Sequence, residues 1–306
     1  MMIQNLRHTL YSAALLALAA LPATASQPPA AAPDPLAQRL CDALHTLPET
    51  RMAQCCGRAP SSSLAGECAR TLSGALEAKA VRLDAADVGR CAEVASQALA
   101  GCDWVTPLMP RSPEACRGLV TGEKAVGAPC SSSLECNEGL FCRGGGSAAG
   151  VCASPGGVGA PCGTSEDLLA SYVRQTDLEV LHPECAGHCM AGGCAAFLPL
   201  GGACSSNRQC AREQHCGAGH CREGAFAASD ETCTATSCGP GTFCKEGKCA
   251  ALKAAGEPCT SPFECKAACV MAEGAKAGTC GMKCGNFPLL GSAGADPPKL
   301  KGSLKP

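Results

Sequence analysis

The sequence has few of the large apolar side chains from which protein cores are built. Leu, Ile, Val and Phe make up 48 of 306 residues, about 16%, and aromatic residues make up 3%. A fraction this low is typical of chains that do not fold by hydrophobic burial alone. Some other source of stability has to replace the missing core.

The sequence also lacks a net charge of either sign. It has 25 basic and 27 acidic side chains, a formal charge of −2, so no electrostatic field favours nucleic acid or an anionic membrane surface as a partner. The longest apolar run, residues 10–21, is shorter than the roughly 20 residues that a membrane-spanning helix needs. We therefore expect neither nucleic-acid binding nor membrane insertion.

Catalytic and metal-binding motifs are missing as well. No Cys-x-x-Cys occurs, which argues against zinc knuckles and thioredoxin-type redox pairs, and there is no G-x-S-x-G, phosphate loop, EF-hand loop or N-x-S/T acceptor. Glu166 and Asp167 form a carboxylate pair with nothing apolar nearby to raise a pKa, so we interpret both as solvated. We predict no catalytic, cofactor-binding or metal site.

The histidines do not change this prediction. His182 and His188 lie within eight residues of Cys185 and Cys189, but cysteines that form disulfides cannot bind zinc, and we expect exposed loop histidines instead. A second pair, His215 and His220, has no third ligand, so we interpret it as incidental.

The N-terminus has the features of an export signal. Arg7 precedes the apolar run, and the small residues Ala23-Thr24-Ala25 end it, so residues 1–25 are predicted to be a signal peptide. Residues 26–35 contain four prolines and are expected to form an extended linker. These features predict a secreted, extracellular protein, with the periplasm as the alternative compartment.

Cysteine is what the sequence has in excess. The 28 cysteines are about one residue in eleven, which predicts a disulfide scaffold in an exported chain. Residues 36–120 hold seven of them and the rest of the chain holds 21, so in a fully oxidised protein an odd number of bridges joins the two parts. Cys284 is one candidate for such a bridge and Cys116 another, whereas adjacent Cys55 and Cys56 are not expected to pair with each other.

Residues 36–120 are predicted to form a helical, cysteine-stapled domain. Asp34 and Pro35 suit the start of a helix in which leucines recur every four residues. Further helices are expected over residues 63–80 and after Asp84, with a short fourth one near residue 112. Trp104, the only tryptophan, is expected to fill the core.

Beyond residue 120 the cysteines form a repeat. Five copies of a four-cysteine module follow one another, at residues 127–152, 159–194, 201–221, 230–249 and 256–284 (modules 1 to 5). Each copy is too short to fold without its bridges and is predicted to be a β-hairpin with an irregular loop. The predicted fold class is small and disulfide-rich, a helical cysteine-stapled domain followed by a row of such modules. Residues 285–306, past the last cysteine, are expected to be disordered.

Four cysteines allow three pairings, and the sequence alone does not select one. The third and fourth cysteines should face each other across the hairpin, which favours a crossed arrangement. For the regular modules this predicts Cys130–Cys142, Cys136–Cys152, Cys204–Cys216, Cys210–Cys221, Cys233–Cys244 and Cys238–Cys249. Modules 2 and 5 depart from the common spacing, so their pairing is open.

The Gly-x-Pro-Cys start and the x5, x5, x4 cysteine spacing resemble the small extracellular modules known as EB and Dickkopf N-terminal cysteine-rich domains. Bacterial secreted proteins that join a helical cysteine-rich head to a row of such modules are similar to this chain over most of residues 36–284. The resemblance implies an extracellular cysteine-rich module protein and does not specify a ligand. The receptor binding of animal Dickkopf proteins is not carried over.

Module 2 contains an insertion between its first two cysteines. Thr164 and Asp167 resemble a capping box, and four residues then share one apolar face of a short helix: Leu168, Leu169, Tyr172 and Val173. The face either packs against a neighbouring module or binds a partner, and its burial distinguishes these two; disorder of the insertion is the third alternative.

These observations favour a non-enzymatic secreted scaffold or interaction protein. Its partner, an unknown protein or a surface polysaccharide, and its oligomeric state are not indicated by any motif, and no cofactor is predicted. One alternative is a module protein that inhibits proteases, although no loop indicates a P1 residue. A less favoured alternative is an enzyme with an unrecognised site in the helical domain, where His45 is the only histidine.

Overall fold

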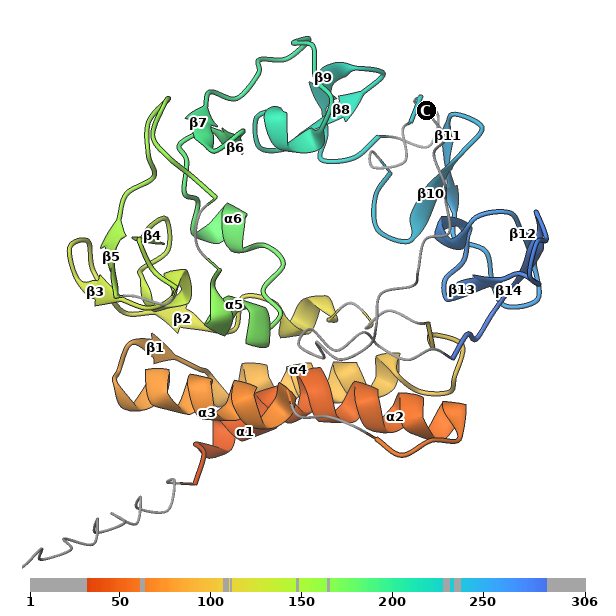
Figure 1. The fold of residues 1–306 in the computed structure, drawn as a ribbon, viewed down its shortest axis with the longest axis horizontal. Helices are drawn as coiled ribbons and strands as arrows, with labels where there is room; N and C mark the ends of the chain where they lie inside the picture. The colour runs from red at the N-terminus through yellow and green to blue at the C-terminus, as the bar shows by residue number, and fades with distance from the viewer. Residues whose placement is uncertain are drawn as a thin grey trace, which may run out of the picture. The chain divides into compact units, whose positions relative to one another are not determined.

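The computed structural model describes residues 32–60, 64–106, 110, 112–146, 149–163, 166–227, 232–233 and 238–284. The predicted signal peptide, most of the proline-rich linker and the predicted disordered tail lie outside these residues. A helical region is followed by small antiparallel sheets (Figure 1), which is the small disulfide-rich fold predicted from the sequence. Within the described residues, no helix has the length and apolarity to span a membrane.

The helical region begins where its capping residues predict. Asp34 accepts hydrogen bonds from the backbone N–H groups of Leu36 and Ala37 at 2.8 and 3.1 Å, and Asp84 caps α4 in the same way. The helices are α1 (Pro35–Cys41), α2 (Leu47–Cys56), α3 (Leu64–Glu77) and α4 (Ala85–Ala98). The short fourth helix is a 3-10 turn, η2 (Glu114–Cys116).

A π-helical segment, η1 (Asp42–Thr46), joins α1 directly to α2. The leucine periodicity predicts helix here but does not reveal the wider turn. Gly57 ends α2 in the left-handed region, with φ at 62°, where glycine avoids the penalty that a Cβ atom brings.

The core of the helical domain is small and is crossed by disulfides. Leu40, Leu72 and Val88 are at most 1% exposed and pack with buried cysteines and alanines. Three bridges lie within the domain: Cys41–Cys68, Cys55–Cys102 and Cys91–Cys116.

Trp104 does not fill this core, contrary to our expectation. It is only partly buried, and its indole N–H lies 3.2 Å from the carbonyl oxygen of Leu99 and 3.1 Å from that of Gly101. These carbonyls follow the end of α4, so the ring satisfies backbone groups that the helix leaves free. Val105 is the buried residue instead.

Each module contains a small antiparallel sheet. Modules 1 and 5 have three strands, β3 (Pro129–Cys130), β4 (Phe141–Arg143) and β5 (Gly150–Ala153), and β12 (Pro258–Cys259), β13 (Ala268–Val270) and β14 (Gly278–Gly281). In both sheets the last strand is central. Modules 2 to 4 have two-stranded hairpins: β6 (His188–Met190) with β7 (Gly193–Ala195), β8 (Gln214–Gly217) with β9 (His220–Glu223), and β10 (Thr242–Lys245) with β11 (Lys248–Ala251).

A short ladder connects the helical domain to the first module. Strand β1 (Val81–Arg82) follows α3 and pairs with β2 (Thr121–Gly122). A Cβ atom at Gly122 would collide with the backbone carbonyl of Cys136. Glycine therefore permits the close approach of module 1 to this strand.

Candidate functional site

The disulfide pairs that build the modules are the most regular feature of the chain. In every hairpin the third and fourth cysteines are direct cross-strand partners. Each is bonded to a cysteine of the preceding loop, so the bonds are crossed, first to third and second to fourth. The pairs of modules 1 to 5 are Cys130–Cys142 and Cys136–Cys152, Cys162–Cys189 and Cys185–Cys194, Cys204–Cys216 and Cys210–Cys221, Cys233–Cys244 and Cys238–Cys249, and Cys259–Cys269 and Cys265–Cys280.

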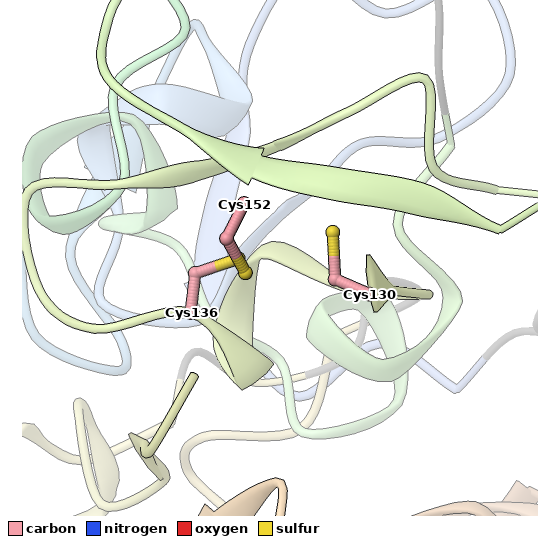
Figure 2. A group of neighbouring side chains, drawn as sticks. All are labelled: Cys130, Cys136 and Cys152. Atoms are coloured by element: carbon pink, nitrogen blue, oxygen red, sulfur yellow. A yellow bond between two sulfur atoms is a disulfide. The ribbon is translucent and has the colours of Figure 1, made fainter. Parts of the chain in front are cut away.

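The crossed bonds bring sulfur atoms together at the centre of each module. In module 1 the sulfurs of Cys130, Cys136 and Cys152 lie within 4.8 Å of one another (Figure 2). Modules 2 to 4 have the equivalent group, and in module 5 the third cysteine takes the place of the fourth. Such a group resembles a metal site, but thiolates are the ligands that bind metals. All 28 cysteines are paired in 14 disulfides, so in the oxidised protein these groups serve as cores.

Backbone contacts repeat along with the cysteines. The residue six positions before the first cysteine forms a parallel bridge with the second cysteine, and the five pairs are Lys124 with Cys136, Gly156 with Cys185, Leu198 with Cys210, Ala227 with Cys238, and Lys253 with Cys265. Sequence reasoning missed this contact because only backbone atoms make it. The residue type at the position differs between modules, and where it is lysine, in modules 1 and 5, the side chain also forms an ion pair.

Modules 1, 3 and 5 present a short 3-10 turn between their first and second cysteines. The turns are η3 (Ser133–Glu135), η4 (Asn207–Gln209) and η5 (Pro262–Glu264). A serine caps each one, and its hydroxyl oxygen accepts the N–H of the middle residue at 3.1 to 3.3 Å. The middle residues are Leu134, Arg208 and Phe263, so one rigid frame displays three different side chains.

An ion pair holds the turns of modules 1 and 5 from behind. Lys124 lies 2.5 Å from the carboxylate of Glu135, and Lys253 pairs with Glu264 in the same way. The hydrogen bonds from Lys253 and Thr260 lower the pKa of the Glu264 carboxyl. These carboxylates hold their turns in place through ion pairs and hydrogen bonds.

The module 2 insertion packs into the helical domain. Its helix α5 (Leu168–Tyr172) places Leu169 and Val173, each 4% exposed, in the same core as Leu40 and Val88. Tyr172 is partly buried against that core, whereas Leu168 is 54% exposed and lies outside it. A further short helix, α6 (Leu178–Leu181), follows.

This burial favours packing over partner binding for the face made of Leu168, Leu169, Tyr172 and Val173. The face packs against the helical domain, whereas the sequence predicted a neighbouring module as the packing partner. Local spacing reveals an apolar face and carries no information about which distant segment covers it.

Asp167 supports this arrangement. Its carboxylate accepts hydrogen bonds from the Ala170 N–H at 2.9 Å, the Ser132 hydroxyl at 2.7 Å and the Ser133 N–H at 2.7 Å. The predicted solvated role is therefore wrong for Asp167, which caps α5 and joins it to module 1, while Glu166 is exposed as expected. The capping-box partner Thr164 lies outside the described residues.

His45 is buried where the π segment meets the insertion. It is 3% exposed; its Nε2–H donates to the carbonyl oxygen of Tyr172 at 2.6 Å, and its Nδ1 accepts from the guanidinium of Arg174 at 3.2 Å. Burial, and then the nearby positive charge of Arg174, lower the pKa of His45 to about 4. Burial also lowers the pKa of Arg174 to about 10. A neutral imidazole thus connects the two parts of the chain.

The other histidines are placed differently from our expectation of exposed loop residues. His182 is 5% exposed, and its Nδ1 contacts the carbonyl oxygen of Leu140 at 2.9 Å. His188 stacks on Phe197, with 6.1 Å between ring centroids. His215 is fully buried, and of these four rings only His220 is exposed. The imidazole rings of His182, His188 and His215 pack inside the small modules, which have few other apolar side chains.

One groove of substantial size occurs among the described residues, on the helical domain. It has a volume of about 740 Å³ and lies between the α1–η1–α2 segment and α4. Pro35, Ala43, Leu47 and Ala92 give it apolar walls, and Asp42 is among its polar residues. No histidine or cysteine lines it, and its polar lining includes Arg39 and the hydroxyl residues Thr46, Thr50 and Ser96.

A single bridge joins the helical domain to the last module. Cys56 pairs with Cys284 across a sequence separation of 228 residues, which satisfies the requirement for an odd number of bridges between the two parts. Cys284, the leftover module cysteine, is the exposed member of the pair. The other candidate, Cys116, pairs with Cys91 inside the helical domain.

The chain matches no family model, no curated protein and no solved structure. The structure itself therefore carries the functional argument. Its fourteen disulfides fit a protein of an oxidising, extracellular environment.

Proposed function

We propose that this protein is a non-enzymatic secreted scaffold whose disulfide-stapled modules hold short loops rigidly for interaction with a partner. The observation that carries the proposal is the repeated frame of crossed disulfides and serine-capped turns, which exposes Arg208 in module 3 and Phe263 in module 5 at one equivalent position, while Leu134 of module 1 is buried there. Rigid display lowers the entropy lost on binding. The likeness to EB and Dickkopf N-terminal modules agrees with this role.

The use of the reactive side chains supports the proposal. Every cysteine is in a disulfide, and the most strongly perturbed histidine, His45, forms hydrogen bonds that join two parts of the fold. Glu135 and Glu264 are hydrogen-bonded within their own modules. Among the described residues, the cysteines, His45 and these two glutamates therefore hold loops and segments together.

Site-specific photocrosslinking tests the proposal. A photoreactive phenylalanine analogue is placed at Arg208 or Phe263 in the secreted protein, and at buried Leu169 as the control. We expect discrete crosslinked species from the two turns, none from the control, and loss of the species after the disulfides are reduced. A protein without adducts from either turn, in which alkylation identifies one reactive thiol, would refute the proposal.

A further inference from the structure

The 3-10 turns of modules 1 and 5 are built alike but end in different environments. Both have a serine cap, a Lys–Glu ion pair behind the turn and an apolar middle residue. Leu134 in module 1 is 1% exposed, whereas Phe263 in module 5 is 78% exposed. An aromatic ring this exposed, on a turn held this firmly, has the form of an interface anchor.

The turn of module 1 packs against a surface that indicates what the similar turn of module 5 can bind. Leu134 is inserted into the core formed by the helical domain and α5, and the hydroxyl of Ser132 donates to the cap of α5. The partner of the turn in module 1 is therefore a helical surface of this same chain. Module 3 has Arg208 at the equivalent position and lacks the apolar anchor.

We propose that Phe263 of one copy docks into the groove between the α1–η1–α2 segment and α4 of a second copy. This rests on the interaction function proposed above and names the partner. The groove of about 740 Å³ has apolar walls and is large enough for a phenylalanine side chain. Its helices belong to the same domain that receives Leu134.

The residues around the anchor suit an apolar groove. Pro262 replaces Ser133 of module 1 and removes the N–H that Ser133 donates to Asp167. The module 5 turn therefore presents Pro262 and Phe263 side by side, and at position 262 it has no backbone N–H that requires a carboxylate acceptor on the partner. Exposed Lys266 follows three residues later, and the groove is lined by both Asp42 and Arg39, so a contact of Lys266 with Asp42, away from Arg39, sets the orientation of the docked copy.

The two surfaces of this contact are different, which makes it a head-to-tail contact. Such a contact repeats from copy to copy and generates open chains or closed rings rather than symmetric pairs. This property allows a test by complementation.

Sedimentation velocity over a range of concentrations measures the association. Phe263→Ser removes the anchor, Ser96→Arg blocks the groove from an exposed position of α4, and Val158→Ser is the control, because Val158, in the segment between modules 1 and 2, is equally exposed at 78%. We expect the first two variants to associate about tenfold to a hundredfold more weakly than wild type, the cost of leaving one phenylalanine unburied. The control should associate like wild type.

Mixing the two defective variants gives the deciding result. The Phe263→Ser copy retains its groove and the Ser96→Arg copy retains its anchor, so we expect the mixture to form dimers and no larger species. A wild-type protein that stays monomeric, a Phe263→Ser variant that associates normally, or a mixture that stays monomeric would each overturn the proposal. A monomeric protein that still gives foreign adducts at Phe263 would keep the interaction function and reject self-association.

Discussion

Acidification should destabilise the helical domain through His45. The ordinary pKa of histidine is 6.5, and burial beside Arg174 lowers the pKa of His45 to about 4 in the folded protein. Between these values the unfolded chain binds a proton that the folded chain does not, so stability is full above pH 6.5 and falls as the pH drops to about 4. The difference corresponds to about 3 kcal/mol of unfolding free energy.

Urea unfolding at intact disulfides, followed by circular dichroism at pH 7 and pH 4, measures this effect. Carboxylates also titrate in this range, so the informative quantity is the difference between wild type and His45→Gln, which cannot be protonated. We expect the stability advantage of wild type at pH 7 to shrink by about 3 kcal/mol at pH 4. His220→Gln, at an exposed histidine, controls for the loss of an imidazole.

A constant difference between wild type and His45→Gln from pH 7 to pH 4 would refute the reasoning. It would mean that His45 takes up a proton in the folded state as readily as in the unfolded state. Burial and the positive charge of Arg174 would then not hold the ring in its neutral form.

Three further predictions concern the joints between the parts of the chain. Leu134→Ala should lower the free energy of unfolding by about 2–5 kcal/mol in urea titrations, because it leaves a cavity in the shared core. Asp167→Asn should lower it by about 1–3 kcal/mol, because a charged acceptor of three hydrogen bonds is lost, with Glu166→Gln as the neutral control. Graded reduction followed by alkylation and mass spectrometry should label Cys56 and Cys284 first, because thiol exchange needs access to a sulfur and Cys284 is exposed.

Each of these has a clear contrary result. An alanine at position 134 that leaves the urea midpoint unchanged would show that module 1 does not share the helical core. Equal effects of the substitutions at 166 and 167 would show that the hydrogen bonds of Asp167 do not contribute. If thiols of the hairpin disulfides were labelled before Cys284, exposure would not govern the order of reduction.

The local features of this fold could be predicted from the sequence. Asp34 and Asp84 identify helix starts because the capping bond forms between residues two or three positions apart. The cross-strand position of the third and fourth cysteines follows from the short turn between them. In each case the interacting groups are neighbours along the chain.

Features that depend on distant contacts could not be predicted in this way. The helix α5 was recognised by its apolar face, but the core that covers it lies more than a hundred residues away in sequence at Leu40 and Leu44. The role of His45 depends on Arg174, and nothing near His45 in sequence indicates that partner. The odd cysteine count showed that a bridge joins the two parts, yet only the structure identifies Cys56 as the partner of Cys284.

The bond between Cys56 and Cys284 also has a mechanical consequence. A pulling force applied to the chain on either side of residues 56 and 284 passes along α1 and α2 and then directly through the disulfide. The backbone between these two cysteines, with all five modules, lies outside this shortest load path. A chain built in this way can be stretched between two attachment points while the turns of its modules keep their shape.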